Sequence, residues 1–164
     1  MKKITFSVLT LIALIGAGCG QSSQPTTTAA AATPAPSGPR EIDISANDTM
    51  KYDITAISAS PGESLKVVFT NAGTIPKEVM GHNWVLLNSN VDVTSFDTAA
   101  SAAKETNYIP ADRAADIIAK VDILGPRKSG EVEFKAPTTP GQYTFICTFP
   151  AHFQAGMHGI LTVK

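Results

Sequence analysis

The chain is poor in the residues from which large metal and cofactor sites are built. Its 164 residues include two cysteines and three histidines, too few for a multi-haem protein or for an iron–sulfur cluster held by four thiolates. Acidic and basic residues nearly balance, 14 against 13, and no basic patch suited to phosphate contacts is visible, which argues against a nucleic-acid partner. The length fits one ordinary domain with at most one small metal centre.

The sequence also lacks an apolar run of the roughly 20 residues that cross a bilayer as a helix. A shorter apolar stretch, 4–17, follows two lysines and ends just before Cys19, as in a secretory signal. The residues before Cys19 resemble a lipobox, although Gly16 stands where such motifs carry a bulky residue. We predict a lipoprotein signal over 1–18, acylation of Cys19 and an exported, extracytoplasmic protein. An ordinary cleaved signal and an uncleaved anchor are the alternatives.

The next segment lacks both charge and large apolar side chains. Residues 20–39 consist of threonine, alanine, proline, serine, glutamine and glycine, a composition that cannot bury a core. The prolines favour extended conformations, as in a spacer. We predict that 19–39 is a tether and that the folded domain spans 40–164.

Beyond the tether, apolar residues mostly recur at every second position, which is typical of half-buried strands. The segments with this pattern are 42–44, 65–69, 121–123, 132–134, 143–147 and 160–163. Turn sequences with proline and glycine separate them, so we predict an all-β sandwich. One alanine-rich segment, 95–105, has helical spacing with Asp97 in its first turn. It predicts one short helix in a long inter-strand excursion over roughly 90–116, covering one side of the sandwich.

A thiol, an imidazole and a thioether follow one another near the C-terminus, at Cys147, His152 and Met157. A strand that ends at Cys147 and a strand that opens near Met157 would bring all three to one end of a sandwich. His82 is the upstream candidate for a fourth ligand. Two imidazoles, a thiolate and a thioether suit copper, because the sulfur ligands stabilise Cu(I) and the imidazoles accept Cu(II). A ligand set that leaves no coordination position open for substrate or water favours electron transfer over catalysis.

Each of these residues has a plainer interpretation when it is taken alone. A free cysteine packs as a small hydrophobe, and methionine commonly fills gaps in cores. The joint spacing of the four favours a mononuclear copper site instead. We expect Trp84 to be a core residue and His158 to be a solvated side chain beside the loop.

The sequences around the candidate ligands resemble the two copper-binding segments of azurin-like cupredoxins. These segments are Met80-Gly-His-Asn-Trp-Val-Leu86 and Cys147-Thr-Phe-Pro-Ala-His152, and the resemblance extends over 40–164. It implies a Greek-key sandwich with one type 1 (blue) copper. The copper contacts that it implies are His82, Cys147, His152, an axial Met157 and a weak contact from the Gly81 carbonyl.

The chain departs from azurins proper in two ways, and the first, which it shares with auracyanins and plastocyanin-like proteins, makes auracyanin the closer match. His152 and Met157 are five residues apart, whereas azurins have four. The disulfide of azurins is also missing, because Cys19 belongs to the signal and Cys147 to the metal.

Further residues are expected to act around the ligands. The resemblance implies that Asn83 ties the two ligand segments together. The N–H of Phe149 can donate to the Cys147 sulfur, whereas Pro150 has no N–H to offer. An apolar patch of Met80, Pro150, Ala151 and Phe153 is expected around the edge of His152, where a partner would dock; mere loop packing is the alternative.

The function that follows is that of a one-electron carrier. We expect a monomer that shuttles electrons from a membrane oxidoreductase to a c-type cytochrome or a photosynthetic reaction centre. Three other interpretations stay open: a Cys–His hydrolase built on Cys147 and His152, a copper storage or delivery protein, and zinc in place of copper.

Overall fold

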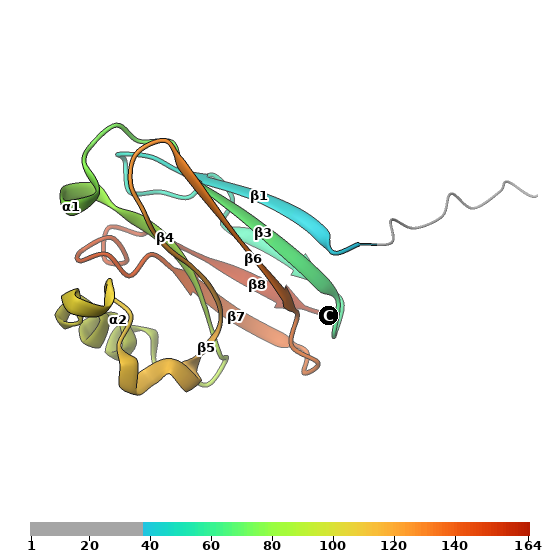
Figure 1. Cartoon of the computed structure of the whole chain (residues 1–164). Coiled ribbons are helices and arrows are strands. Elements are labelled where there is room, and N and C mark those ends of the chain that lie inside the picture. The colour runs from blue at the N-terminus through green and yellow to red at the C-terminus, as the bar shows by residue number, and fades with distance from the viewer. Residues whose placement is uncertain (1–37) are drawn as a thin grey trace, which may run out of the picture. The chain divides into compact units, whose positions relative to one another are not determined.

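The computed structural model describes residues 38–164, which form two β-sheets with a helical excursion (Figure 1). The predicted signal peptide, Cys19 and the tether up to residue 37 lie outside the described residues. Among those described, no helix combines the length and apolar character needed to cross a membrane.

The two sheets have three and five strands. The first has the order β1 (Arg40–Ala46), β3 (Ser64–Asn71), β6 (Lys128–Lys135). The second has the order β2 (Ala56–Ala59), β8 (His158–Val163), β7 (Gly141–Ile146), β4 (His82–Leu87), β5 (Ile117–Leu124). β1 is parallel to β3 and β2 to β8, while the other pairs are antiparallel. The predicted sandwich is confirmed.

Alternating burial along the strands creates the core between the sheets. In β3, Leu65, Val67 and Phe69 are fully buried, as the period-two pattern predicted. Trp84 is also fully buried, and its ring packs 5.6 Å from that of Phe145 and 5.9 Å from that of Phe134. Trp84 is therefore a core residue, as expected.

β4 was not among the predicted strand segments, although Trp84 was expected in the core on a period-two pattern with Leu86; both faces of this strand are covered. All six of its residues are buried. Trp84 and Leu86 face the core between the sheets, whereas Val85 and Leu87 belong to a second cluster with Phe96 of the helical excursion. A strand covered on two sides reads as a continuous apolar run and loses the alternation.

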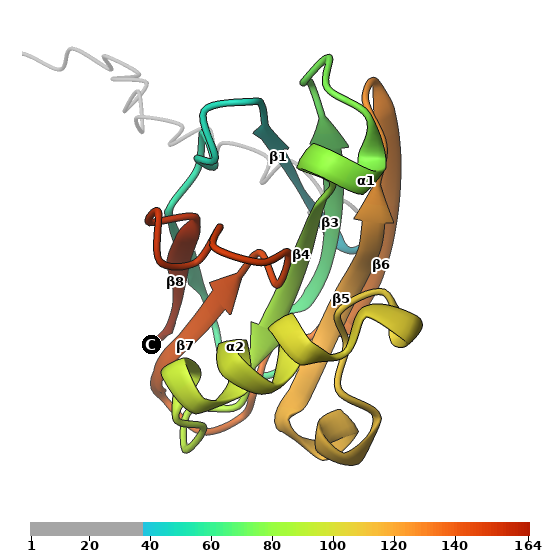
Figure 2. The same cartoon turned by 90° about the vertical axis from the view of Figure 1, so that its left-hand side faces the viewer.

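The predicted helix is present, with different ends. α2 spans Val93–Ala102, starting two residues earlier and ending three residues earlier than predicted. It starts earlier because the Asp92 side chain caps it, accepting from the Ser95 N–H at 2.9 Å. Asp97 consequently lies in the middle of the helix and is buried, not in the first turn. Figure 2 shows α2 alongside β7, β4 and β5, below the loop that joins β7 to β8.

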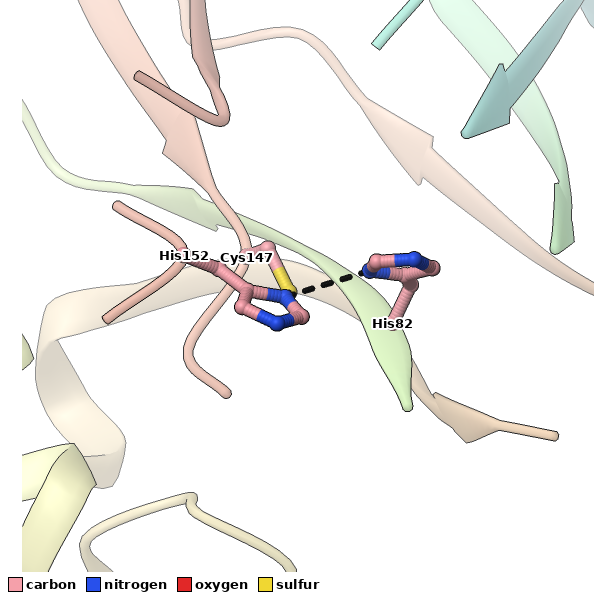
Figure 3. Close-up of side chains that lie close together, drawn as sticks. All are labelled: His82, Cys147 and His152. Atoms are coloured by element: carbon pink, nitrogen blue, oxygen red, sulfur yellow. Dashed lines mark hydrogen bonds between the residues drawn. The ribbon is translucent and has the colours of Figure 1, made fainter. Parts of the chain in front are cut away.

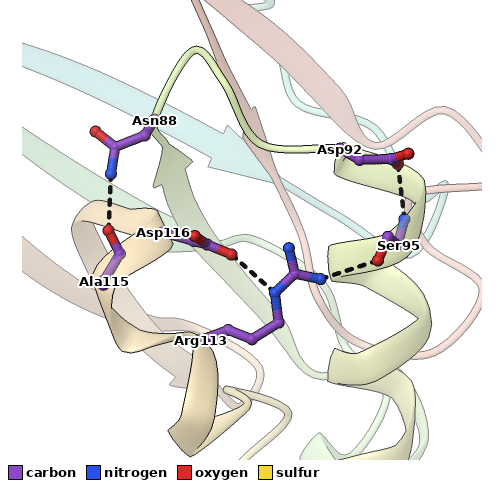
Figure 4. Close-up of polar contacts among 6 residues, drawn as sticks. All are labelled: Asn88, Asp92, Ser95, Arg113, Ala115 and Asp116. Atoms are coloured by element: carbon purple, nitrogen blue, oxygen red, sulfur yellow. Dashed lines mark hydrogen bonds and ion pairs between the residues drawn. The ribbon is translucent and has the colours of Figure 1, made fainter.

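The rest of the excursion is held by polar contacts with α2 and with Asn88, the residue that follows β4 (Figure 4). Short helices at Lys104–Thr106 and Ala111–Asp116 follow α2. Arg113 donates to Asp116 at 2.7 Å and to the Ser95 hydroxyl at 3.1 Å. The Asn88 amide donates to the Ala115 carbonyl at 2.8 Å, so both ends of the excursion are fixed beside the sheet.

A glycine in β8 provides a test of the packing at the ligand end. A Cβ at Gly159 would overlap the ring of Phe145 and lie 2.5 Å from the carbonyl oxygen of Thr55. Gly159→Ala should therefore lower the free energy of unfolding by about 2 kcal/mol, as overpacking does, in urea titrations of the copper-free protein. Gly141→Ala is the matched control, because its nearest new contact would be 3.8 Å away. Equal stabilities of the two variants would contradict the packing described.

Candidate metal centre

The pairing of two neighbouring strands brings the ligand segments together. β4 and β7 are antiparallel, with Val85 opposite Ile146. The start of β4, at His82 and Asn83, therefore lies beside the segment that follows β7, which begins with Cys147 and Thr148. Residues 65 positions apart in the sequence meet through the register of one strand pair.

The other two ligands lie on the tight loop between β7 and β8. The His152 N–H donates to the Phe149 carbonyl at 3.1 Å, and the Met157 N–H donates to the His152 carbonyl at 2.9 Å. The loop closes where the Cys147 N–H donates to the Met157 carbonyl at 3.1 Å. Gly156 takes a φ of +93°, which an L side chain rarely adopts. Backbone hydrogen bonds thus fix the spacing of three of the four ligands.

Three donor atoms converge in a buried cluster (Figure 3). The Nδ1 atoms of His82 and His152 are 3.2 Å apart, and the Cys147 sulfur is 3.4 Å from Nδ1 of His152. All three donors lie within 4.8 Å of one another. His82 and Cys147 are fully buried and His152 is 2% exposed. Met157, the predicted fourth ligand, is also fully buried.

Burial sets the protonation of the metal-free cluster. It raises the pKa of the Cys147 thiol to about 12, although the backbone N–H groups of Asn83 and Phe149 act in the opposite direction. Burial also lowers the pKa of His82, and together with the charge of His82 it lowers the pKa of His152 to about 4. Without metal, all three groups are therefore neutral at pH 7.

This protonation argues against a nucleophilic thiol. A reactive cysteine needs a lowered pKa, an exposed sulfur and a cationic neighbour. Cys147 has a raised pKa, a buried sulfur and a neutral neighbour, His152, at 3.4 Å. The cluster is suited to a metal cation, which displaces the thiol proton and takes the neutral imidazole nitrogens as ligands.

The donor set decides which metal fits. Two imidazoles that face each other at 3.2 Å can both bond one ion at about 2.0 Å. A thiolate and a thioether exclude hard cations such as Mg²⁺ and Ca²⁺, whereas the mixture of soft sulfur and imidazole donors suits copper in both oxidation states. The residues present thus fit one copper ion.

Asn83 links the two ligand segments directly. Its side-chain oxygen accepts from the Thr148 N–H at 2.8 Å, and its side-chain nitrogen donates to the Thr148 hydroxyl at 2.7 Å. The Tyr52 hydroxyl donates to the Asn83 carbonyl at 2.5 Å. Asn83 and Thr148 are fully buried, so the link is shielded from competing water. The sequence interpretation gave Asn83 this linking role, through the backbone beside Cys147, but it did not include the Thr148 hydroxyl or Tyr52.

Two aromatic rings stack in sequence beside His152. The Phe149 ring lies 4.8 Å from the His152 ring, and the Tyr108 ring lies 5.1 Å from that of Phe149. Tyr108 has a left-handed φ of 60° and comes from the excursion, so the sequence alone gave no sign of this contact.

The remaining predicted residues flank the cluster. Gly81 ends the short helix α1 (Lys77–Met80), immediately before β4. Met80, Pro150 and Phe153 are half-buried, and Ala151 is exposed. His158, the histidine outside the cluster, is exposed and packs its ring 5.4 Å from that of Phe153.

Comparisons with known proteins agree with this geometry. A sequence model of the copper-binding proteins of the plastocyanin/azurin family matches residues 40–164. The chain belongs to this family. The cupredoxin fold and a single type 1 copper site with ligands His82, Cys147, His152 and Met157 are thereby confirmed. Proteins of this family carry electrons and are not enzymes, so this cupredoxin is an electron carrier.

Named relatives include both auracyanins and azurins. The chain is 33% identical to auracyanin-B of Chloroflexus aurantiacus over 87% of its own length, but spans 63% of that protein. It is 35% identical to the azurin of Pseudomonas denitrificans over 75% of the chain and 97% of the azurin. The structure of reduced auracyanin from Roseiflexus castenholzii matches with a TM-score of 0.68 and 35% identity, covering 77% of this chain and 98% of that one.

The buried imidazoles make the stability of the copper-free protein depend on pH. The pKa of His152 falls from 6.5 to about 4 on folding, so at lower pH the unfolded state binds more protons. The stability present at neutral pH is lost as the pH falls toward 4. From His152 alone, the free energy of unfolding should drop by about 2 kcal/mol between pH 7.5 and 5, measured by urea titration. His158→Asn should keep this slope and His152→Asn should lose most of it; a flat wild-type profile would contradict the assignment.

Proposed function

We propose that this cupredoxin carries single electrons between redox partners outside the cytoplasmic membrane. The donor is a membrane oxidoreductase, and the acceptor is a c-type cytochrome or a photosynthetic reaction centre. The observation that carries the proposal is the buried convergence of His82, Cys147 and His152 within 4.8 Å. The match to auracyanins, which come from photosynthetic bacteria, supports the choice of partners.

The role of the chain is to hold the ligands still. Copper, when bound, supplies one-electron chemistry by alternating between Cu(I) and Cu(II). The Asn83–Thr148 hydrogen bonds and the backbone bonds of the loop restrain the ligands, so little rearrangement accompanies the change of charge. Burial excludes water and substrates from the site, and it also disfavours the ligand exchange that copper delivery needs.

The thiolate is the ligand that gives the site its colour. Copper-loaded wild type should be intensely blue, should bleach on addition of ascorbate, and should regain its colour on reoxidation without loss of copper. Cys147→Ser should abolish the visible band, because the sulfur-to-copper charge transfer is lost. Ser60→Ala, at an exposed turn between β2 and β3, is a control that should stay blue. A colourless, copper-loaded wild type would overturn the proposal.

Partners are expected to dock at the ligand end of the sandwich. The proposed docking surface comprises Val79, Met80, Pro150, Ala151 and Phe153. Among residues 38–164, Val79 is the one large hydrophobic residue that is exposed, at 62%. The sequence interpretation did not include it. These residues come from α1 and from the loop that carries His152. A small apolar surface of this kind suits a partner that must release quickly.

A charge placed on this surface should slow transfer without altering the copper. Ala151 is exposed, so Ala151→Lys should keep the blue band while lowering the rate of electron transfer to a c-type cytochrome by about tenfold, in stopped-flow measurements at low salt. Thr138→Lys adds the same charge at an exposed turn between β6 and β7 and should leave the rate nearly unchanged. Equal rates for the two variants would place docking elsewhere.

We also propose that Cys19 anchors the protein by its acyl chains, with 19–39 as the tether. The apolar stretch before Cys19 and the proline-containing, uncharged segment after it support this. In cells, wild-type protein should sediment with membranes and incorporate labelled palmitate, and Cys19→Ala should do neither. Detection of wild type in the soluble extracytoplasmic fraction alone would refute anchoring and leave export intact.

A further inference from the structure

A buried carboxylate lies next to the ligand loop and is not part of the ligand set. Asp97, on the inner side of α2, is fully buried. One carboxylate oxygen, Oδ2, accepts a hydrogen bond from the Gln154 side-chain amide, while Oδ1 has no partner among residues 38–164. The neighbouring inward residues Phe96 and Ala100 pack in an apolar cluster. Burying a carboxylate there costs free energy, so packing alone does not account for it.

The partner of Asp97 lies between two ligands. Gln154 follows His152 by two residues and precedes Met157 by three. The tip of the loop has two backbone hydrogen bonds of its own, from Ala155 N–H to the Ala151 carbonyl at 2.9 Å and from Gly156 N–H to the Phe153 carbonyl at 2.8 Å. The Asp97–Gln154 contact therefore joins α2 to the segment that sets the distance from His152 to Met157.

A second charged side chain holds the same segment. The Lys51 ammonium donates to the Ala155 carbonyl, next to Gln154. Lys51 comes from the connection between β1 and β2, and Asp97 comes from α2. The loop tip is thus held by contacts from two separate parts of the fold, one basic and one acidic.

The carboxylate of Asp97 lies in the interior beside the ligand loop. It is fully buried and bonded to Gln154, two residues after the ligand His152. The Cu(II) site carries one more positive charge than the Cu(I) site. A carboxylate in a poorly screened interior therefore stabilises the oxidised site more than the reduced one, which lowers the reduction potential.

We propose that Asp97 is a positioning residue of the copper centre, which fixes the loop between His152 and Met157 through Gln154 and lowers the reduction potential by its charge. This inference rests on the proposed function. It adds a residue of α2, outside both ligand segments, to the determinants of the potential.

Two variants separate charge from position in the full, copper-loaded chain. Asp97→Asn keeps the size and an acceptor oxygen for Gln154 but removes the charge. It should raise the ratio of Cu(I) to Cu(II) affinity by about three- to tenfold, where tenfold corresponds to 59 mV for one electron, in spectroelectrochemical titrations. Glu105→Gln removes an exposed charge of the same excursion and is the matched control, with an expected change of less than about twofold.

Gln154→Leu removes the donor at an exposed position of the loop and should fold even if Asp97→Asn does not. The amide hydrogens of Ala155, Gly156 and Met157 should exchange about tenfold faster in this variant than in wild type, both with and without copper. A blue Asp97→Asn protein with the wild-type potential, or unchanged exchange in Gln154→Leu, would overturn the inference. A wild type that binds no copper would instead overturn the proposed function.

Discussion

The desolvation of three ligating side chains is the constraint on which the rest of this structure depends. Two imidazoles and a thiol are shut away from water, and burial holds all three neutral without metal by raising the pKa of Cys147 and lowering those of His82 and His152. The Cys147–His152 pair is therefore not set up as a nucleophilic catalytic pair. It becomes electrostatically satisfied when a cation replaces the thiol proton, which links the stability of the fold to copper.

Such a cluster requires that its ligands be held by the rest of the fold. His82 and Cys147 meet because β4 and β7 are neighbours, and Asn83 and Thr148 join the same two segments by paired side-chain hydrogen bonds. The loop ligands are held by backbone bonds within 147–157 and by contacts from Asp97 and Lys51. The same restraints that keep the copper-free site assembled keep the ligands still when an electron arrives.

Much of this architecture could be predicted from the sequence, because the signals are local. The spacing of Cys147, His152 and Met157 encodes a loop that is closed by its own backbone, and period-two strands encode the sandwich. In β4 the period-two pattern of Trp84 and Leu86 is masked by Val85 and Leu87, which are apolar because the second face of the strand is covered by α2. Asp97 was placed in the first turn of a helix that in fact begins earlier, at the Asp92 cap. Contacts such as Asp97 with Gln154 or Tyr108 with Phe149 depend on how the excursion folds back, and no periodicity encodes them.

Because the ligands are buried, a partner cannot reach the metal and the electron must pass through a ligand. His152 is the ligand nearest to the surface, at 2% exposure, and the residue before it, Ala151, is exposed. The loop therefore does two things: its Ala151 side meets the partner, and its Gln154 side is held from the interior by Asp97. These points lie on opposite sides of His152 in the chain, so docking and potential can change independently. Substitutions at Ala151 should act on the rate of transfer through the docking surface, and substitutions at Asp97 should act on the driving force.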